Sequence, residues 1–181
     1  MPDLRAARCG PLLALAGAVA TLPPATRYVL RGADAARHAA GKALGVELPG
    51  VACRAGTAGE RAALWLGPDE WLLIAPEADA AEVSAALERA LADVPHSLVD
   101  VSHRQCALGV QGHQAATLLA AGCPLDLDPA AFPVGMCTRT MLAKSEVVLW
   151  RTAADTFRIE VWRSFAPYVT QFLAEAGRGN I

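Results

Sequence analysis

The stretch SLVDVSHRQCALGVQGHQAATLLAAGCPLDL, residues 97–127, contains the clearest succession of fold signals in the chain. Residues 97–101 form a short apolar-rich segment that predicts a strand, and a polar bend follows it. Residues 105–110 then alternate, with Cys106, Leu108 and Val110 as the apolar members. A period of two is typical of a strand with one buried face. The stretch therefore predicts two strands separated by a tight polar turn.

The second half of the same stretch predicts a short helix. Gly112 breaks the strand pattern, and residues 113–121 carry Leu118 and Leu119 on one apolar side. We expect Gly122 to close this helix as a left-handed cap, and the proline that follows it prevents the helix from resuming.

Working outward, residues 63–91 predict a β-hairpin followed by a helix. The turn is Gly-Pro-Asp at residues 67–69, between strands 63–66 and 70–75. Asp79 and Glu82 have the spacing of a capping box that opens a helix. An earlier helix is predicted from Asp34, as its N-cap, to Leu44, with Gly45 as its end.

The C-terminal region repeats this theme. Residues 146–151 and 156–162 predict a second hairpin with a turn at 152–155, and Ser164 is placed to cap the last helix, which Gly177 ends. We expect the apolar stripe of that helix to be formed by Phe165, Tyr168, Val169, Phe172, Leu173 and Ala176.

Placing Asp69 on Asp155 also aligns Trp71 with Phe157, which suggests an internal duplication. Hairpins interrupted by packed helices favour an α+β fold with antiparallel sheets. We expect two related small lobes, with residues 1–25 as an N-terminal arm, 26–96 as the first lobe and 97–181 as the second, together forming one compact domain.

The composition excludes some classes of function. The 181 residues are 54% hydrophobic and 19% charged, which suits a subunit that buries part of its surface against partners. The net charge is −2 and no cluster of basic residues occurs, so we expect no nucleic-acid binding. No apolar run is long enough to span a membrane.

The five cysteines are irregularly spaced, lack a Cys-x-x-Cys pair and do not combine with the histidines into a zinc pattern. Reduced thiols in a cytoplasmic protein are the simplest interpretation. The first 21 residues nevertheless resemble a signal peptide, with Arg5 and Arg8 before an apolar run and Ala-Val-Ala before Thr21. An exported domain therefore remains an alternative.

No catalytic motif is found, and we expect this chain to hold no catalytic, cofactor-binding or metal-binding residue. The nearest approach to an active site is Asp100, Ser102, His103 and Arg104, which have the groups for proton transfer. The alternative, which we favour, is a polar turn in which Asp100 and Ser102 accept backbone N–H bonds and Arg104 pairs with Asp100.

Three further residues have two interpretations each. Cys123 is either a nucleophile or, as we favour, a structural cysteine, because the sequence places no Lys, Arg or His beside it to activate the thiol. Arg139 is suited to bind an anion or to form a salt bridge with another domain or subunit. Trp162 is either a packing residue in the core or at the edge of the sheet or, because it lies opposite the apolar face of its strand, the first candidate for a partner contact.

Five segments of the chain, taken together, resemble the gamma subunit of heterotetrameric sarcosine oxidase. They occur in that family's order and lie within residues 60–176: LGPDEWLL (66–73), LVDVSHRQ (98–105), AAGCPLDL (120–127), FPVGMCTRT (132–140) and FRIEVWRSF (157–165). More widely, the turn, strand and helix of residues 100–119 are similar to the folate-binding domain of the glycine-cleavage T-protein. This kinship also implies an α+β fold of two related lobes.

The resemblance implies a small, non-catalytic subunit of an oxidoreductase that demethylates sarcosine to glycine and yields hydrogen peroxide and 5,10-methylenetetrahydrofolate. It implies alpha, beta and delta subunits as partners, and it places FAD, FMN, NAD, tetrahydrofolate and zinc on those partners. Folate-using relatives carry paired acids before the last hairpin turn, where this chain has only Glu146. A stand-alone folate-binding or one-carbon-transfer protein of the T-protein type, with Asp100 as its acid, is the alternative.

Overall fold

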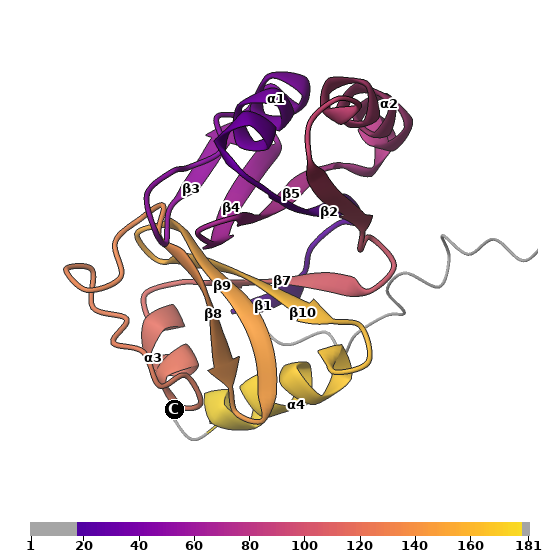
Figure 1. Cartoon of the computed structure of the whole chain (residues 1–181). Coiled ribbons are helices and arrows are strands. Elements are labelled where there is room, and N and C mark those ends of the chain that lie inside the picture. Colours follow the sequence, from indigo (N-terminus) through magenta and orange to yellow (C-terminus); the bar gives the residue numbers. More distant parts are fainter. Residues whose placement is uncertain (1–17, 179–181) are drawn as a thin grey trace, which may run out of the picture. The chain divides into compact units, whose positions relative to one another are not determined.

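The computed structural model describes residues 18–178 (Figure 1). The first elements in chain order are β1 (Val19–Thr21), β2 (Ala25–Gly32), α1 (Asp34–Leu44), β3 (Ala55–Ala58), β4 (Arg61–Gly67), β5 (Glu70–Pro76), a 3₁₀ turn η1 (Glu77–Asp79), α2 (Ala80–Leu91) and β6 (His96–Asp100). They are followed by β7 (Gln105–Gln111), α3 (Ala115–Ala120), β8 (Cys137–Leu142), β9 (Ser145–Ala153), β10 (Thr156–Trp162) and α4 (Ala166–Arg178).

The strands form two antiparallel sheets. The first sheet has the order β3-β4-β5-β2-β6, and the second has the order β1-β7-β10-β9-β8. Helices pack on both sheets, so the predicted α+β class is confirmed. None of the helices within residues 18–178 is long and apolar enough to cross a membrane.

The chain divides into two compact units. Residues 24–102 form the first, and residues 103–178 form the second together with the described residues before Pro24. The sequence pattern predicts a lobe boundary between residues 96 and 97, but β6 pairs with β2 and therefore belongs to the first sheet. The arm likewise includes strand β1, which pairs with β7. Most of the signal-like segment, residues 1–17, lies outside the described residues.

The internal repeat is visible in the strand orders. Read from β6, the first sheet runs β6-β2-β5-β4-β3, and each strand matches its counterpart in β1-β7-β10-β9-β8. Both predicted hairpins form, as β4–β5 and β9–β10, and a helix follows each. The carbonyl of Asp69 accepts the N–H of Gly32 at 3.0 Å, and that of Asp155 accepts the N–H of Gly112 at 2.9 Å. Each hairpin turn is therefore fastened to its neighbouring strand in the same way.

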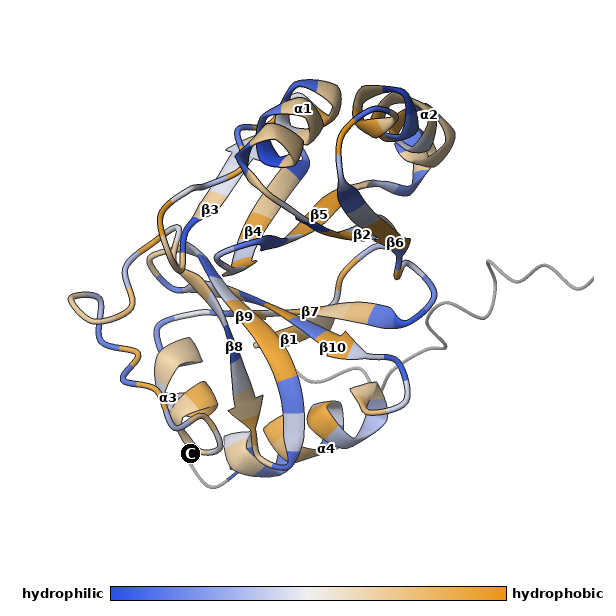
Figure 2. Cartoon of the chain, in the orientation of Figure 1, coloured by the Kyte–Doolittle hydropathy of each residue, from blue (hydrophilic) through white to orange (hydrophobic). Residues whose placement is uncertain are grey.

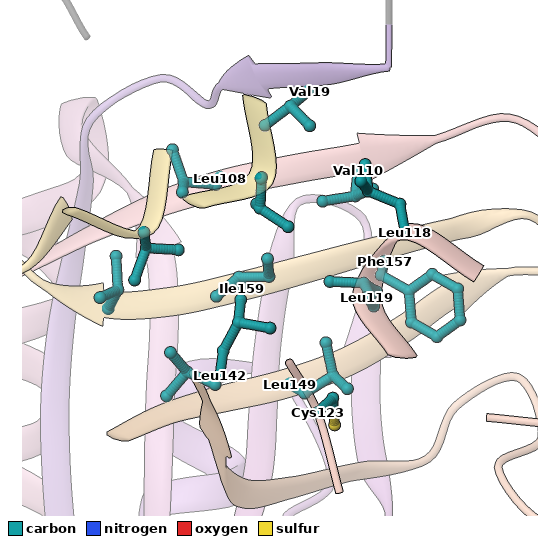
Figure 3. Close-up of a cluster of buried hydrophobic side chains, with 14 of the residues drawn as sticks. Val19, Leu108, Val110, Leu118, Leu119, Cys123, Leu142, Leu149, Phe157 and Ile159 are labelled. Carbon is teal, nitrogen blue, oxygen red and sulfur yellow. The ribbon is translucent and has the colours of Figure 1, made fainter. Parts of the chain in front are cut away.

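The core of the second unit lies between its sheet and helices α3 and α4 (Figure 3). Alternation on β7 and β10 directs one set of side chains to this core, including Leu108, Val110, Phe157 and Ile159. Figure 2 shows the hydrophobic stretches of β9 and β10 that supply much of it. Each buried aliphatic side chain contributes about 1.5–3 kcal/mol relative to exposure.

In the first unit, α1 and α2 lie side by side and cover one face of their sheet (Figure 1). Trp71 is the largest fully buried side chain and is 1% exposed. Its indole Nε1–H donates to the carbonyl of Pro49 at 2.8 Å, which satisfies the polar atom of an otherwise apolar residue.

Two of the predicted helix starts are wrong in detail. Asp34 lies in the first turn of α1 rather than at its N-cap, which is Ala33, and it pairs with Arg37 at 3.0 Å. Asp79 precedes α2 but makes no side-chain cap. The guanidinium of Arg61 instead binds both acids of the expected capping box, donating to Asp79 at 2.7 Å and to Glu82 at 3.3 Å. A guanidinium from a neighbouring strand outcompetes the backbone N–H groups here.

Three glycines were predicted to end helices, and only one of them does so in the expected way. Gly45 ends α1 with φ of 74°, as predicted. Gly122 does not adopt the expected left-handed conformation: α3 is capped by Ala121, and a Cβ on residue 122 would lie 2.6 Å from the ring of Phe172. Close packing therefore requires glycine at this position. Gly177 lies inside α4 and does not end it.

The predicted apolar stripe of α4 is only partly right. Val169 and Leu173 are buried as expected, but Phe165 and Tyr168 are 43% and 39% exposed. Phe172 and Ala176 are partly buried and pack against the core, as expected, and Ala166 and Thr170, which the prediction did not include, are buried as well. Two aromatic rings of the predicted stripe therefore remain on the surface while two small side chains are buried.

Candidate functional site

The bend after β6 has the geometry of a structural turn. Asp100 is exposed, and its Oδ1 accepts the backbone N–H of Ser102 at 2.8 Å. Ser102 is buried, and its Oγ accepts the backbone N–H of Arg27 at 2.8 Å. Both side chains therefore fix the path of the backbone, as in the interpretation we favoured.

His103 and Arg104 follow this bend and are exposed. The guanidinium of Arg104 lies 5.4 Å from the centroid of the Trp162 ring, and its backbone carbonyl accepts the N–H of Arg163 at 2.7 Å. The contact with Trp162 is of the cation–π type, and the pairing of Arg104 with Asp100 stays a prediction. Two of the residues singled out from the sequence, Arg104 and Trp162, are therefore brought together.

Trp162 is one of three aromatic side chains exposed in succession. Trp162 at the end of β10, Phe165 just before α4 and Tyr168 in its first turn are 42%, 43% and 39% exposed. The rings of Trp162 and Phe165 meet edge to face, with centroids 6.5 Å apart. The hydroxyl of Tyr168 accepts the backbone N–H of Lys144 at 3.3 Å. We call Arg104, Trp162, Phe165 and Tyr168 the aromatic surface.

Phe165 and Tyr168 were missed as surface residues because their spacing suits either face of a helix. The stripe 166, 169, 170 and 173 is equally periodic, but alanine and threonine made it less apolar than the alternative. The spacing of Trp162, Phe165 and Tyr168, each three residues after the last, was the feature of the sequence that could have indicated a shared exposed face.

Arg139 lies elsewhere. It is exposed on β8, the edge strand of the second sheet, in register with Val148 on β9. Val148 in turn pairs with Glu160 on β10, so two strand intervals separate Arg139 from β10. The structure does not place Arg139 in the aromatic surface.

Arg151 is a buried cation that the sequence did not single out. It is 3% exposed, and its guanidinium donates to the carbonyls of Phe132 at 2.8 Å, Leu127 at 3.1 Å and Ala154 at 2.6 Å. It also lies 4.9 Å from the ring centroid of Phe157. All of these acceptors are backbone groups, so Arg151 holds the loop between α3 and β8 rather than a ligand.

Three of the four cysteines within residues 18–178 are buried, and Cys53 is half-buried. Cys106, Cys123 and Cys137 are buried, and Cys123 lies among aliphatic side chains of the second core (Figure 3). Its Sγ is 3.9 Å from the hydroxyl of Thr140. Across residues 18–178, no group of His, Cys, Asp or Glu is arranged to hold a metal ion.

A half-open cavity of about 280 Å³ lies beside the second sheet, lined by residues of β1, β7, β9 and β10 and by Leu22. Its lining contains no carboxylate, imidazole or thiol, so it offers no group for acid–base or nucleophilic chemistry. The cation in its wall, Arg158, is paired with the buried Glu160 at 2.7 Å.

Comparisons with known proteins agree with the family resemblance noted in the sequence. The model of the sarcosine oxidase gamma subunit family matches residues 31–178. Sarcosine oxidase subunit gamma of Corynebacterium sp. (strain P-1) is 40% identical over 136 residues, which span 75% of this chain and 66% of that relative. The chain therefore spans about two thirds of the length of this curated relative.

Solved structures agree in fold. A chain of heterotetrameric sarcosine oxidase from Corynebacterium sp. U-96 superposes with a TM-score of 0.84 at 32% identity, covering 97% of this chain and 90% of that one. The glycine cleavage system aminomethyltransferase T from Bartonella henselae has a TM-score of 0.66 at 15% identity, covering 88% of this chain and 46% of that one. The latter likeness concerns the fold alone.

Proposed function

Because the chain belongs to the sarcosine oxidase gamma subunit family, we propose that it serves as a non-catalytic subunit of a heterotetrameric sarcosine oxidase. The complex would demethylate sarcosine oxidatively to glycine, with hydrogen peroxide and 5,10-methylenetetrahydrofolate as further products. This chain would contribute to assembly rather than to chemistry.

The observation that carries the proposal is the match to a chain of a solved heterotetrameric sarcosine oxidase, which extends over 97% of this chain with a TM-score of 0.84. The described residues support a structural role. Asp100 and Ser102 are engaged by backbone N–H groups, and the cavity of the second unit lacks acid–base side chains.

We further infer that the partners are alpha, beta and delta subunits in the cytoplasm, and that these partners hold the FAD, FMN, NAD, tetrahydrofolate and zinc. On β9, where folate-using relatives carry an acid pair, this chain has the single exposed acid Glu146. That difference supports folate use by another subunit. Asp100, His103, Arg104, Arg139 and Trp162 are, under this proposal, turn or interface residues.

Co-purification tests the proposal. The tagged chain, expressed in its native host, is isolated and its companions are identified by mass spectrometry and visible absorption. We expect a yellow complex with three further subunits that produces hydrogen peroxide only when sarcosine is added. A colourless chain that comes down without a flavoprotein would overturn the proposal.

The alternative, a stand-alone folate-binding protein, requires a buried acid in a pocket. Asp100, its candidate, is exposed and bound to the N–H of Ser102. Titration of the isolated chain with tetrahydrofolate, monitored by calorimetry, separates the two functions. Saturable binding that disappears in a folded Asp100→Ala variant would favour the alternative, and no binding is what we expect.

A further inference from the structure

The aromatic surface, formed by Arg104, Trp162, Phe165 and Tyr168, has the features of a docking site. We propose that it binds an apolar hollow rimmed by carboxylates on another subunit of the complex. This inference deepens the proposed function and rests on it, since it names which face of the chain meets a partner and what chemistry that partner offers.

The first argument is exposure. Large hydrophobic side chains that are exposed among the described residues include only three aromatics, and all three fall between residues 162 and 168. Tryptophan and tyrosine are enriched at the energetic centres of interfaces, and clustered exposed apolar groups mark interaction sites. Exposed valines occur singly elsewhere, as at Val51 and Val99, and need no such explanation.

The second argument is rigidity. Trp162 pairs in register with Gln105 of β7, so its backbone is part of the second sheet. Ala166 and Val169, which are 1% and 0% exposed, anchor the first turn of α4 in the core. The side chains of the aromatic surface therefore project from a fixed backbone, which lowers the entropy lost on binding.

The third argument is charge. Residues 101–111 and 161–174, which supply the aromatic surface, contain Arg104 and Arg163 and no aspartate or glutamate. Two acids directly precede these segments: Glu160 is buried and paired with Arg158 at 2.7 Å, and Asp100 is exposed and accepts the N–H of Ser102 at 2.8 Å. A partner that covers the aromatic surface would therefore gain from carboxylates at its rim.

The same charges argue against other occupants. A second copy of this chain, meeting the first through the same face, would bring Arg104 and Arg163 near their own equivalents. The segment 1–17 carries two arginines and one aspartate, so it does not complement a basic face either. Charge thus favours a different, acidic partner over both.

Arg104 gives the contact its direction. Its guanidinium is stacked at 5.4 Å over the Trp162 ring, and a guanidinium held in this way can still offer two parallel N–H groups to a carboxylate. Trp162 and Arg104 would therefore enter the partner together, with the ring in an apolar hollow and the guanidinium at its acidic edge.

The test uses the remaining subunits of the complex, purified from a host strain lacking this chain, and measures the dissociation constant of the added full chain by biolayer interferometry. We expect the double variant Trp162→Ala, Phe165→Ala to bind at least about 30-fold more weakly, as for a central hot spot. We expect Arg104→Glu to weaken binding by about 10-fold or more, because it places an acid against acids. Added salt should weaken the binding of the wild-type chain to the other subunits more than it weakens the binding of the Arg104→Glu variant.

Matched controls are Val51→Ser, an exposed hydrophobic residue of the first unit, and Arg89→Glu, an exposed arginine of α2. Both should bind within about twofold of wild type, and circular dichroism checks that every variant is folded. Wild-type affinity of the folded double variant would overturn the inference while leaving the proposed function intact. A wild-type chain that forms a dimer, dispersed by Trp162→Ala, would overturn it in favour of a second copy. Failure of the wild-type chain to bind any of the subunits would instead refute the proposed function.

Discussion

Replacing Arg151 by methionine would test whether one buried cation holds the loop between α3 and β8. Methionine retains an unbranched apolar stem but removes the guanidinium that donates to the carbonyls of Leu127, Phe132 and Ala154 at 3.1, 2.8 and 2.6 Å. Three acceptors would lose their donor in a site where Arg151 itself is only 3% exposed.

The magnitude follows from these contacts. Hydrogen bonds to a charged group contribute about 1.5–3 kcal/mol each, and a buried carbonyl left unpaired costs about 1–3 kcal/mol. The desolvation of the guanidinium, which the variant no longer requires, offsets part of that sum. We therefore expect Arg151→Met to lower the free energy of unfolding by about 3–5 kcal/mol. Arg151→Lys should lose about half as much, because an ammonium cannot reach all three carbonyls.

Urea unfolding, monitored by tryptophan fluorescence, measures the loss directly. Limited proteolysis should also show faster cleavage within residues 123–136 of the variant, because Arg151 bonds to this loop at Leu127 and Phe132. Arg178→Met is the matched control, since Arg178 pairs with Glu175 in a bridge that is 74% and 57% exposed. That control should cost less than about 0.5 kcal/mol. A loss of under about 1 kcal/mol in Arg151→Met would refute the reasoning.

Two other changes follow from contacts described above. Gly122→Ala should lower the free energy of unfolding by about 1–3 kcal/mol, because its Cβ would lie 2.6 Å from the Phe172 ring. The control is Gly67→Ala, whose Cβ would meet nothing closer than 3.6 Å. Equal thermal unfolding temperatures for the two variants would contradict this account. The side-chain hydrogen bond to Asp79 and, after it, the bond to Glu82 raise the pKa of Arg61. Because the pKa is raised on folding, the stability that this cation contributes is fully present below the pKa of arginine in the unfolded chain and is lost as the pH rises from there through the pKa in the folded protein. The roughly 1 kcal/mol that we expect Arg61→Met to cost should therefore stay constant from about pH 7 to about pH 10 in urea titrations, and a steady decline across that range would show that another group carries the effect.

The sequence predicted those parts of the fold that depend on neighbouring residues. Both hairpins could be recognised because their turns, at residues 67–69 and 152–155, lie between strands that pair with each other. Strand β1 could not, because it has only three residues and its partner, β7, lies far along the chain. For the same reason the sequence did not show that β6 and β7 belong to different sheets, since each pairs with strands that lie far from it along the chain.

The candidate site shows the same limit. Arg104 and Trp162 were recognised singly, but their contact depends on the pairing of β7 with β10. Local patterns also suggested competitors that lost: the acids at 79 and 82 had the spacing of a capping box, yet a strand arginine binds them. Arg151 had no local signal at all, because each of its acceptors is a backbone carbonyl.

The position of β1 has a consequence for the order in which the protein can form during synthesis. β1 leaves the ribosome before any other described strand, but its pairing of Val19 with Val110 must wait until β7 has been made. The whole first sheet, ending with β6, is available for folding in that interval. A nascent chain halted once residue 102 has left the ribosome should therefore hold a folded first unit and an unpaired β1, so that the first-made of the described strands waits longest for its partner.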